Sequence, residues 1–209
     1  MTPYQHLESL KPRGIIHVGA NDGEEFAYYQ SLGVKNLIGF EPLKKPFREF
    51  SKQYPEVIKY QLGWGKVSGK YGINITENDK ASSILKTVPT DDWTTHPVFK
   101  DWNMGQWPVV GREIVEVINY DEWMDKNQHY EPEDYNCLVM DVQGFELEAL
   151  RGAEKQLAYF DTLIVECSET PVYEGEPPAS EIVSWLSNKG FYQATPIIAH
   201  GDILFRRQA

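Results

Sequence analysis

The chain has 209 residues, of which 41% are hydrophobic and 24% are charged, and these values fit one globular domain with a sizeable core. The net charge of −11 and the pI of about 4.9 argue against a general surface for nucleic acids or anionic membranes, because such surfaces need clustered Lys and Arg. The sequence has no run of about 18 apolar residues, and its first residues lack the apolar stretch of a signal peptide. We therefore expect a cytoplasmic protein that binds neither membranes nor nucleic acids.

Short apolar runs alternate with amphipathic segments along the chain. The expected strands cover residues 14–20, 36–42, 57–63, 71–76, 113–120, 137–142, 162–167 and 201–207. The expected helices cover residues 24–33, 45–54, 145–160 and 179–190, and glycine ends two of them, at Gly33 and Gly190. Strands that alternate with helices over short connections predict an α/β fold with a mostly parallel sheet and right-handed crossovers.

The segment from residue 76 to 112 is the exception, and it is rich in Thr, Asp, Pro and Trp. It is too long for an ordinary connection, so we expect an inserted lid or substrate loop within a single domain of residues 1–209. Trp93, Trp102 and Trp107 have two interpretations. They form either a stacking wall for a sugar ring or an aromatic acceptor, or a local hydrophobic cluster that holds the loop.

Both cysteines lie in apolar runs of the sequence. We interpret Cys137 and Cys167 as buried, reduced thiols, with a disulfide as the alternative. Two cysteines without a CxxC spacing or a histidine cluster do not make a zinc site.

The first expected strand runs into "GIIHVGANDGEEF", in which Gly19 and Gly23 lie close together. In an open α/β sheet, ligands bind at the carboxyl ends of the strands, near the topological switch point. The second strand ends in "GFEP", and Glu41 lies about 20 residues after Gly19, where an acid can accept hydrogen bonds from ribose hydroxyls. The combination of Gly19 and Glu41 therefore suggests an adenosine-type cofactor.

The residues that follow Gly19 discriminate between such cofactors. A dinucleotide motif needs a glycine where Asn21 stands, and its pyrophosphate rests on the helix N-terminus. Asp22, Glu24 and Glu25 crowd that end and would repel phosphates, although acids also commonly cap a helix. S-Adenosylmethionine carries a cationic sulfonium and no phosphate, so an acidic pocket lined by backbone suits it better than a dinucleotide.

A set of motifs carries a family resemblance. The segments "HVGANDG", "GFEP", "LGWGKVSG", "ASSILK", "INYDEW", "MDVQGFELEALRGAEKQL" and "LIVECSE" resemble, in order and spacing, the FkbM-type S-adenosylmethionine-dependent methyltransferases over about residues 14–170. The resemblance implies the Rossmann-like class I methyltransferase fold, a seven-stranded, mostly parallel sheet with helices on both faces. Its last two strands would lie at 191–198 and 202–207, with the final strand antiparallel. The resemblance also implies O-methylation, often of sugars or of hydroxyls on natural products.

The resemblance further assigns a cofactor site by motif match. The methionine tail would contact Gly19, Ala20, Asn21 and Gly23. The ribose would contact Glu41, which Pro42 follows, and the adenine would lie against Gln61, Leu62 and Gly63. The transferring methyl group would lie beside Asp141, Val142, Gln143 and Gly144. Ser82 and Ser83 match an element near the cofactor and the acceptor, although a serine pair alone is typical of a turn.

Two positions depart from the family pattern. His17 stands where the family commonly has an acid that helps to place the methionine amino group, and a histidine there could make cofactor binding sensitive to pH. The interpretation that we favour is a neutral core histidine bonded to backbone. Gln143 stands where many members have Glu, and it either orients the acceptor or caps the following helix.

Three carboxylates are candidates for the base that removes the proton of a hydroxyl acceptor. Asp141, at the tip of its strand, is the first, and Glu166, in the neighbouring strand, is the second. Glu146 is the third, although an acid in the first turn of a helix is usually structural. Asp141 and Glu166 could also hold Mg²⁺, but two carboxylates without a third ligand do not predict a metal site.

The leading hypothesis for function is an S-adenosylmethionine-dependent O-methyltransferase that acts on a hydroxyl of a saccharide or small natural product. A nicotinamide-dependent oxidoreductase on a Rossmann sheet is the second hypothesis, and Asn21 argues against it. A non-catalytic methyltransferase-like binding module is the third. The sequence names neither the acceptor nor the oligomeric state.

Overall fold

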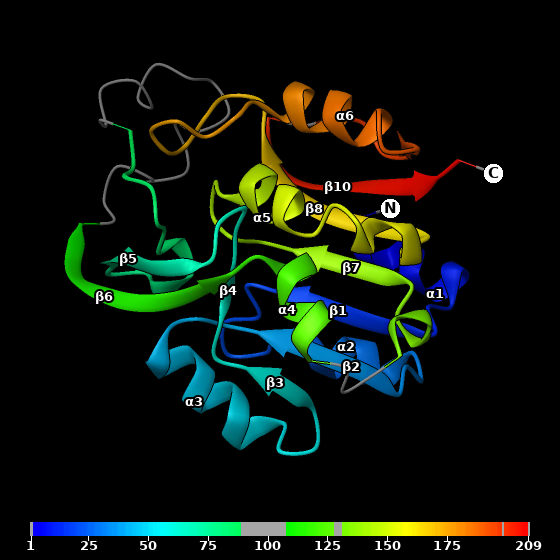
Figure 1. Cartoon of the computed structure of the whole chain (residues 1–209), viewed down its shortest axis with the longest axis horizontal. Helices are drawn as coiled ribbons and strands as arrows, with labels where there is room; N and C mark the ends of the chain where they lie inside the picture. The colour runs from blue at the N-terminus through cyan, green and yellow to red at the C-terminus, as the bar shows by residue number, and fades with distance from the viewer. Residues whose placement is uncertain (1, 89–107, 128–130, 198, 209) are drawn as a thin grey trace.

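The computed structural model describes residues 2–88, 108–127, 131–197 and 199–208. Its centre is a seven-stranded sheet in the order β3-β2-β1-β7-β8-β10-β9 (Figure 1). The strands are β1 (Gly14–Val18), β2 (Asn36–Phe40), β3 (Ile58–Tyr60), β7 (Cys137–Met140), β8 (Thr162–Ser168), β9 (Phe191–Gln193) and β10 (His200–Arg207). Strand β1 runs parallel to β2 and β7, β2 runs parallel to β3, and β7 runs parallel to β8. Strand β10 is antiparallel to both of its neighbours, β8 and β9. The predicted α/β fold and its antiparallel last strand are confirmed.

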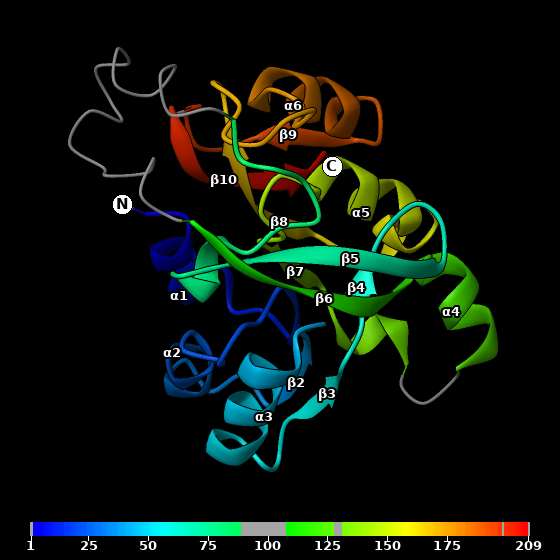
Figure 2. The same cartoon turned by 90° about the vertical axis from the view of Figure 1, so that its left-hand side faces the viewer.

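A second, smaller sheet is a feature that the sequence did not reveal. It consists of β4 (Gly63–Trp64), β5 (Gly69–Thr76) and β6 (Val109–Ile118) in the order β4-β6-β5. The apolar runs that begin at residues 71 and 113 thus pair with each other rather than with the central sheet. Figure 2 shows this sheet standing beside the ends of the central strands.

The predicted insertion at residues 76–112 coincides only partly with irregular structure. Residues 109–112 belong to β6, and η2 (Asp79–Ala81) is a short 3-10 helix just after β5. The predictions for Trp93, Trp102 and Trp107 lie outside the described residues.

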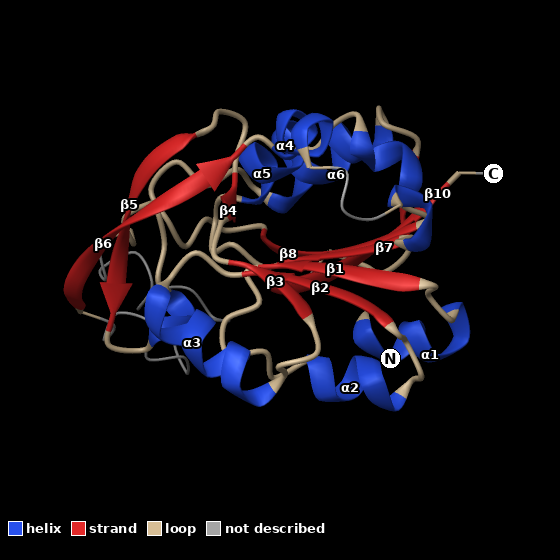
Figure 3. Ribbon diagram, turned by 60° about the horizontal axis from the view of Figure 1, so that its bottom comes forward, coloured by secondary structure: helices blue, strands red, loops and turns tan. Residues whose placement is uncertain are grey.

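Helices cover both faces of the central sheet. In Figure 3, α1 (Leu7–Leu10), α2 (Phe26–Ser31) and α3 (Lys44–Gln53) lie on one face, and α4 (Tyr120–Lys126), α5 (Glu146–Gly152) and α6 (Ala179–Ser187) lie on the other. The predicted helix at 145–160 is divided into α5 and the 3-10 helix η6 (Gln156–Tyr159). Helix α4 replaces the end of a predicted strand because the Asn119 side chain caps it, accepting a hydrogen bond from the Glu122 amide at 3.0 Å.

Alternate residues of the central strands pack into two hydrophobic clusters, one under each helical layer. Val18 and Met140 belong to the cluster beneath α5, whereas Ile15 and Val139 belong to the cluster beneath α2 and α3. Because helices cover both faces of the central sheet, the sequences of its strands are continuous apolar runs. No helix among the described residues has both the length and the apolar character needed to cross a membrane.

The two cysteines lie in these clusters, Cys137 in one and Cys167 in the other. Both are free and buried, as expected of reduced thiols, and no disulfide joins them. Burial raises the pKa of the Cys137 thiol to about 12 and also raises that of Cys167. Both thiols are therefore protonated and unreactive at neutral pH.

Gly19 lets the turn after β1 lie directly against the end of β7. Its φ is +82°, and a Cβ atom at this position would lie 1.6 Å from the Asp141 carbonyl oxygen. Gly23, with φ of +85°, would similarly place a Cβ 2.4 Å from the Phe50 ring. The two glycines are thus required by backbone conformation and packing, whether or not a ligand is bound.

We predict that Gly19→Ala destabilises the fold more than Gly33→Ala. Gly33 also has a positive φ, of +79°, but its Cβ would meet nothing within 4 Å. Gly33→Ala should cost about 1–2 kcal/mol for the left-handed conformation alone. Gly19→Ala should cost about 1–3 kcal/mol more, because the turn must move away from Asp141. Urea unfolding of both variants measures the difference, and equal losses would show that the close contact is unimportant.

Candidate functional site

The carboxyl ends of β1, β2 and β7 meet beneath the smaller sheet and border an open cleft. The cleft is open to solvent, and its empty space, with the open solvent included, is about 850 Å³. Of the residues predicted to bind a cofactor, those that line it are Gly19, Asn21, Glu41, Pro42 and Gly63 from the first strands, and Ser82, Ser83, Asp141, Val142 and Gln143 from later segments. The predicted residues that lie outside the lining are His17, Ala20, Gly23, Gln61 and Leu62, together with the carboxylates Glu146 and Glu166.

The structure adds residues to the cleft that the sequence did not assign to it. Glu24, Glu25 and Lys80 line its polar side, and Trp64 and Val117 line its apolar side. In the sequence, the two acids were interpreted as groups that repel phosphate and suit a cationic cofactor, or as helix caps. Val117 reaches the site from β6, and Lys80 reaches it from η2, just after β5. No sequence pattern reveals the position of the sheet that these segments belong to or follow.

Glu41 joins the turn after β1 to the turn after β2. Its carboxylate is 4% exposed and accepts hydrogen bonds from the Asn21 amide at 3.0 Å and the Leu43 amide at 2.7 Å. Burial raises the pKa of Glu41 to about 7, while these two hydrogen bonds oppose the rise. Each oxygen accepts one of these bonds and has a second lone pair, so the group is still able to accept from a ligand hydroxyl.

The turn from Gly19 to Gly23 uses its amides internally. The Gly19 and Ala20 amides both donate to the Phe40 carbonyl, and the Gly23 amide donates to the Ala20 carbonyl. The Asn21 amide donates to Glu41, and the Asp22 amide donates to the Asn21 side chain at 2.8 Å. This turn therefore presents carbonyls and side chains to the cleft rather than a row of free amide donors.

His17 lies in the core on the α2 side of β1. It is 2% exposed, its ring stacks on Phe26 at 5.8 Å, and its Nδ1 atom lies 3.2 Å from the Tyr29 hydroxyl. Burial lowers the pKa of His17 to about 3, so the ring is neutral at physiological pH. Its partner is a side chain rather than the backbone that we expected.

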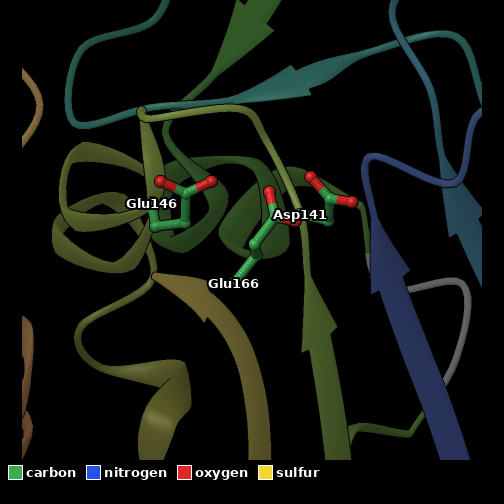
Figure 4. Close-up of side chains that lie close together, drawn as sticks. All are labelled: Asp141, Glu146 and Glu166. Atoms are coloured by element: carbon green, nitrogen blue, oxygen red, sulfur yellow. The ribbon is translucent and has the colours of Figure 1, made fainter. Parts of the chain in front are cut away.

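Three carboxylates gather at the ends of β7 and β8, next to the cleft. Oxygen atoms of Asp141, Glu146 and Glu166 lie within 4.8 Å of one another (Figure 4). Gln143 lies between two of them, because its Nε2 atom donates to Asp141 at 2.6 Å and to Glu166 at 2.8 Å. Its Oε1 atom accepts from the Tyr173 hydroxyl at 2.5 Å. Gln143 therefore orients two of the predicted catalytic groups.

Burial and mutual repulsion keep this cluster partly protonated. Burial raises the pKa of Asp141, and the hydrogen bonds from Gln143 and Glu166 oppose the rise. Burial and the Asp141 charge raise the pKa of Glu166 well above its usual range. Ionising both groups at once is therefore unfavourable, and the pair holds its protons to higher pH than free carboxyl groups do.

His200 contacts Glu166 and Ser168 next to this pair. Its Nε2 atom is 3.5 Å from Glu166, and its Nδ1 atom is 2.8 Å from the Ser168 hydroxyl. Burial lowers the pKa of His200, and the Asp141 charge opposes the change.

Glu146 holds the loop that leads from β7 to α5. Its Oε1 atom accepts from the Val142 amide at 2.9 Å and from the Gly144 amide at 3.2 Å. Together with Asp141 and Glu166 it supplies the third carboxylate that the sequence argument against a metal site lacked. However, the Gln143 amide donates into the gap between Asp141 and Glu166, where a cation would have to bind. A cation between these two carboxylates would therefore have to displace the Gln143 amide.

We predict that Glu146→Gln stabilises the fold increasingly as pH rises. Burial raises the pKa of Glu146 to about 8, so its contribution to stability is fully present below the unfolded pKa near 4.5 and is lost as pH rises through 8. The glutamine keeps a carbonyl acceptor and never ionises. The variant should gain about 1–3 kcal/mol over the wild type between pH 6 and 9. Urea unfolding across this range measures the gain, with Glu148→Gln on the same helix as the control, and a constant difference would contradict the prediction.

Comparisons with known proteins agree with this geometry. Residues 17–192 match the family model of the methyltransferase FkbM domain. No curated protein sequence matches the chain significantly.

Several solved structures share the fold at low sequence identity. A proposed RNA methyltransferase from Pyrococcus horikoshii has 10% identity and a TM-score of 0.51, over 99% of this chain and 83% of that chain. A proposed tRNA methyltransferase from Streptococcus pneumoniae, solved with S-adenosyl-L-methionine, has 12% identity and a TM-score of 0.51, over 98% and 72% of the two chains. A precorrin-6y C5,15-methyltransferase from Geobacter metallireducens has 7% identity and a TM-score of 0.50, over 94% and 80%. These likenesses identify the fold alone.

Proposed function

Because the chain belongs to the FkbM family of methyltransferases, whose cofactor is S-adenosylmethionine, we propose that it methylates a hydroxyl oxygen of a saccharide or small natural product. The observation that carries this proposal is the pair of Asp141 and Glu166, whose pKa values are raised and which the Gln143 amide bridges next to the cleft. A hydroxyl must lose its proton when it is methylated, and a carboxylate with a raised pKa is suited to accept it.

The electrostatics of the cleft fit the cofactor. Glu24, Glu25, Glu41 and Asp141 line it, and the cofactor has a cationic sulfonium and ammonium but no phosphate. Burial raises the pKa of Glu25 to about 7, and the nearby Glu24 and Asp141 charges raise it as well, so a bound cation would favour its ionised form. Pyrophosphate would be repelled by the same groups, which argues against the nicotinamide alternative.

The residues that line the cleft suit different parts of the cofactor and the acceptor. Glu41 supports the ribose because it is buried and keeps free lone pairs for two hydroxyl donors. Gly63, Trp64 and Val117 form an apolar wall that suits the adenine ring. Asp141 and Gln143 lie at the other side, at the end of β7, where the acceptor would be positioned.

The proposed reaction uses few groups of the protein. The bound cofactor supplies an already activated methyl group. Asp141 accepts the proton of the acceptor hydroxyl, and the negative charge of Asp141 is lost as the oxygen–carbon bond forms. Gln143 keeps the carboxylate directed towards the cleft, and burial raises the proton affinity of Asp141. Most of the rate enhancement then comes from holding the hydroxyl in line with the methyl group.

A small acceptor is favoured over RNA, although two structures of similar fold are proposed RNA-modifying enzymes. The net charge of −11 repels a phosphate backbone, and the carboxylates that line the cleft repel it further. A neutral sugar hydroxyl meets no such repulsion.

We predict that calorimetry detects micromolar binding of S-adenosylhomocysteine, about 7–8 kcal/mol, and no measurable binding of NAD. Glu41→Gln should weaken S-adenosylhomocysteine binding about tenfold or more, because it exchanges a charged acceptor for a neutral one at the ribose. Glu116→Gln, at an exposed position of β6 outside the cleft lining, serves as a control. Tight NAD binding without S-adenosylhomocysteine binding would refute the assignment of the cleft.

We predict that Asp141→Asn lowers turnover about 10²–10⁴-fold while the affinity for S-adenosylhomocysteine changes only a few-fold. Wild-type kcat should fall at acidic pH with an apparent pKa above that of a free carboxyl group, since the pKa of Asp141 is raised. A panel of sugars and glycans, assayed for S-adenosylhomocysteine release, would supply the acceptor.

The matched control is Asp125→Asn on the exposed side of α4, and melting temperatures identify any loss of folding. A chelator should leave wild-type turnover unchanged. If a chelator abolished turnover, the carboxylate cluster would be a metal site, and if Asp141→Asn kept normal turnover, Asp141 would not be the base.

A further inference from the structure

Lys80 is the only cationic side chain among the described residues that line the cleft. The acids Glu24, Glu25, Glu41 and Asp141 line the same cleft. This balance suits the sulfonium and ammonium groups of S-adenosylmethionine, but the methionine tail also ends in a carboxylate. That group must find a positive partner or hydrogen-bond donors within an otherwise acidic site.

The backbone turn after β1 does not provide such donors. Its amides from Gly19 to Gly23 all donate to protein acceptors, two of them to Phe40 and one to Glu41. A carboxylate placed beside this turn would therefore face carbonyl oxygens and the acids that follow them. Lys80 reaches the same region, because its ammonium group pairs with Glu24 in the turn.

The segment that carries Lys80 is fixed, while the side chain itself is free to move. Ala81 accepts a hydrogen bond from the Tyr173 hydroxyl at 3.1 Å, and Ser83 pairs with Asn74 through backbone bonds in both directions. Lys80 itself is half-exposed, and its flexible stem is held only by an exposed ion pair, which is a weak interaction in water. The ammonium group is thus anchored over the cleft but able to exchange partners.

We propose that Lys80 binds the carboxylate of the methionine tail, leaving Glu24 when the cofactor binds. The proposal rests on the assignment of the cleft to S-adenosylmethionine and adds the group that recognises the end of its tail. In this arrangement Glu24 takes the place of the cofactor's carboxylate until the cofactor binds. Lys80 then makes the site selective for adenosyl compounds that carry an intact amino-acid tail.

Calorimetry with three ligands tests this role. The probes are S-adenosylhomocysteine, decarboxylated S-adenosylmethionine and 5′-methylthioadenosine, of which only the first carries the carboxylate. Lys80→Met should raise the Kd of S-adenosylhomocysteine at least tenfold, while the Kd values of the other two ligands change less than about threefold. Lys80→Arg should keep S-adenosylhomocysteine binding within about threefold of the wild type, because the positive charge is retained.

Two control variants separate this effect from general electrostatics and from folding. Lys86→Met removes an exposed lysine of the same segment outside the cleft lining, and it should not change any of the three affinities. Glu77→Gln removes an exposed acid of the same segment outside the cleft lining, and it should not change the three affinities either. Melting temperatures should be the same for all the lysine variants.

The experiment distinguishes a failure of the proposed function from a failure of the role proposed for Lys80. If the wild-type protein binds none of the three ligands, the proposed function itself is wrong. If the wild type binds S-adenosylhomocysteine but Lys80→Met weakens all three ligands equally, or none of them, then Lys80 does not recognise the carboxylate and the proposal is overturned.

Discussion

The cleft depends on the close contact between the turn after β1 and the end of β7. Gly19 lies against the Asp141 carbonyl with no room for a side chain, and Glu41 ties the same turn to the end of β2 through the Asn21 amide. These contacts place three strand ends, which are far apart in the sequence, at a common edge. The glycine that first suggested a ligand contact is therefore explained by packing, and the ligand site is a consequence of how the strand ends are joined.

The sequence was sufficient for the central sheet because its strands are apolar on both faces and its turns carry glycines of positive φ, such as Gly33 and Gly190. It was insufficient for the smaller sheet, because the pairing of β5 with β6 is a long-range contact without a local pattern. The same limit applies to the site. Asp141 and Glu41 follow strands and could be placed at a sheet edge, whereas Lys80 and Trp64 reach the cleft only through tertiary structure. The environment of His17 was inaccessible as well, since its partner Tyr29 comes from α2.

The carboxyl groups in and beside the cleft lower the stability of the fold and supply the proposed site with its charged groups. Glu41 and Glu146 are buried and Glu166 is partly buried, and burial raises the pKa of each. Burying ionisable groups costs free energy of folding, which the apolar clusters around the sheet offset. Backbone amides bound to Glu41 and Glu146 show that part of this cost supports loop geometry. Asp141 and Glu166 are in addition bridged by the Gln143 side-chain amide, which places them at the cleft.

Tyr173 has one hydroxyl hydrogen and two acceptors within reach, the Ala81 carbonyl at 3.1 Å and the Gln143 Oε1 atom at 2.5 Å. A single hydrogen cannot serve both acceptors fully at once, so the segment that carries Lys80 and the amide that bridges the carboxylates compete for it. When the hydrogen turns towards Ala81, Gln143 loses a restraint on its orientation. One hydroxyl group thereby links the segment next to Lys80 to the amide that contacts Asp141 and Glu166.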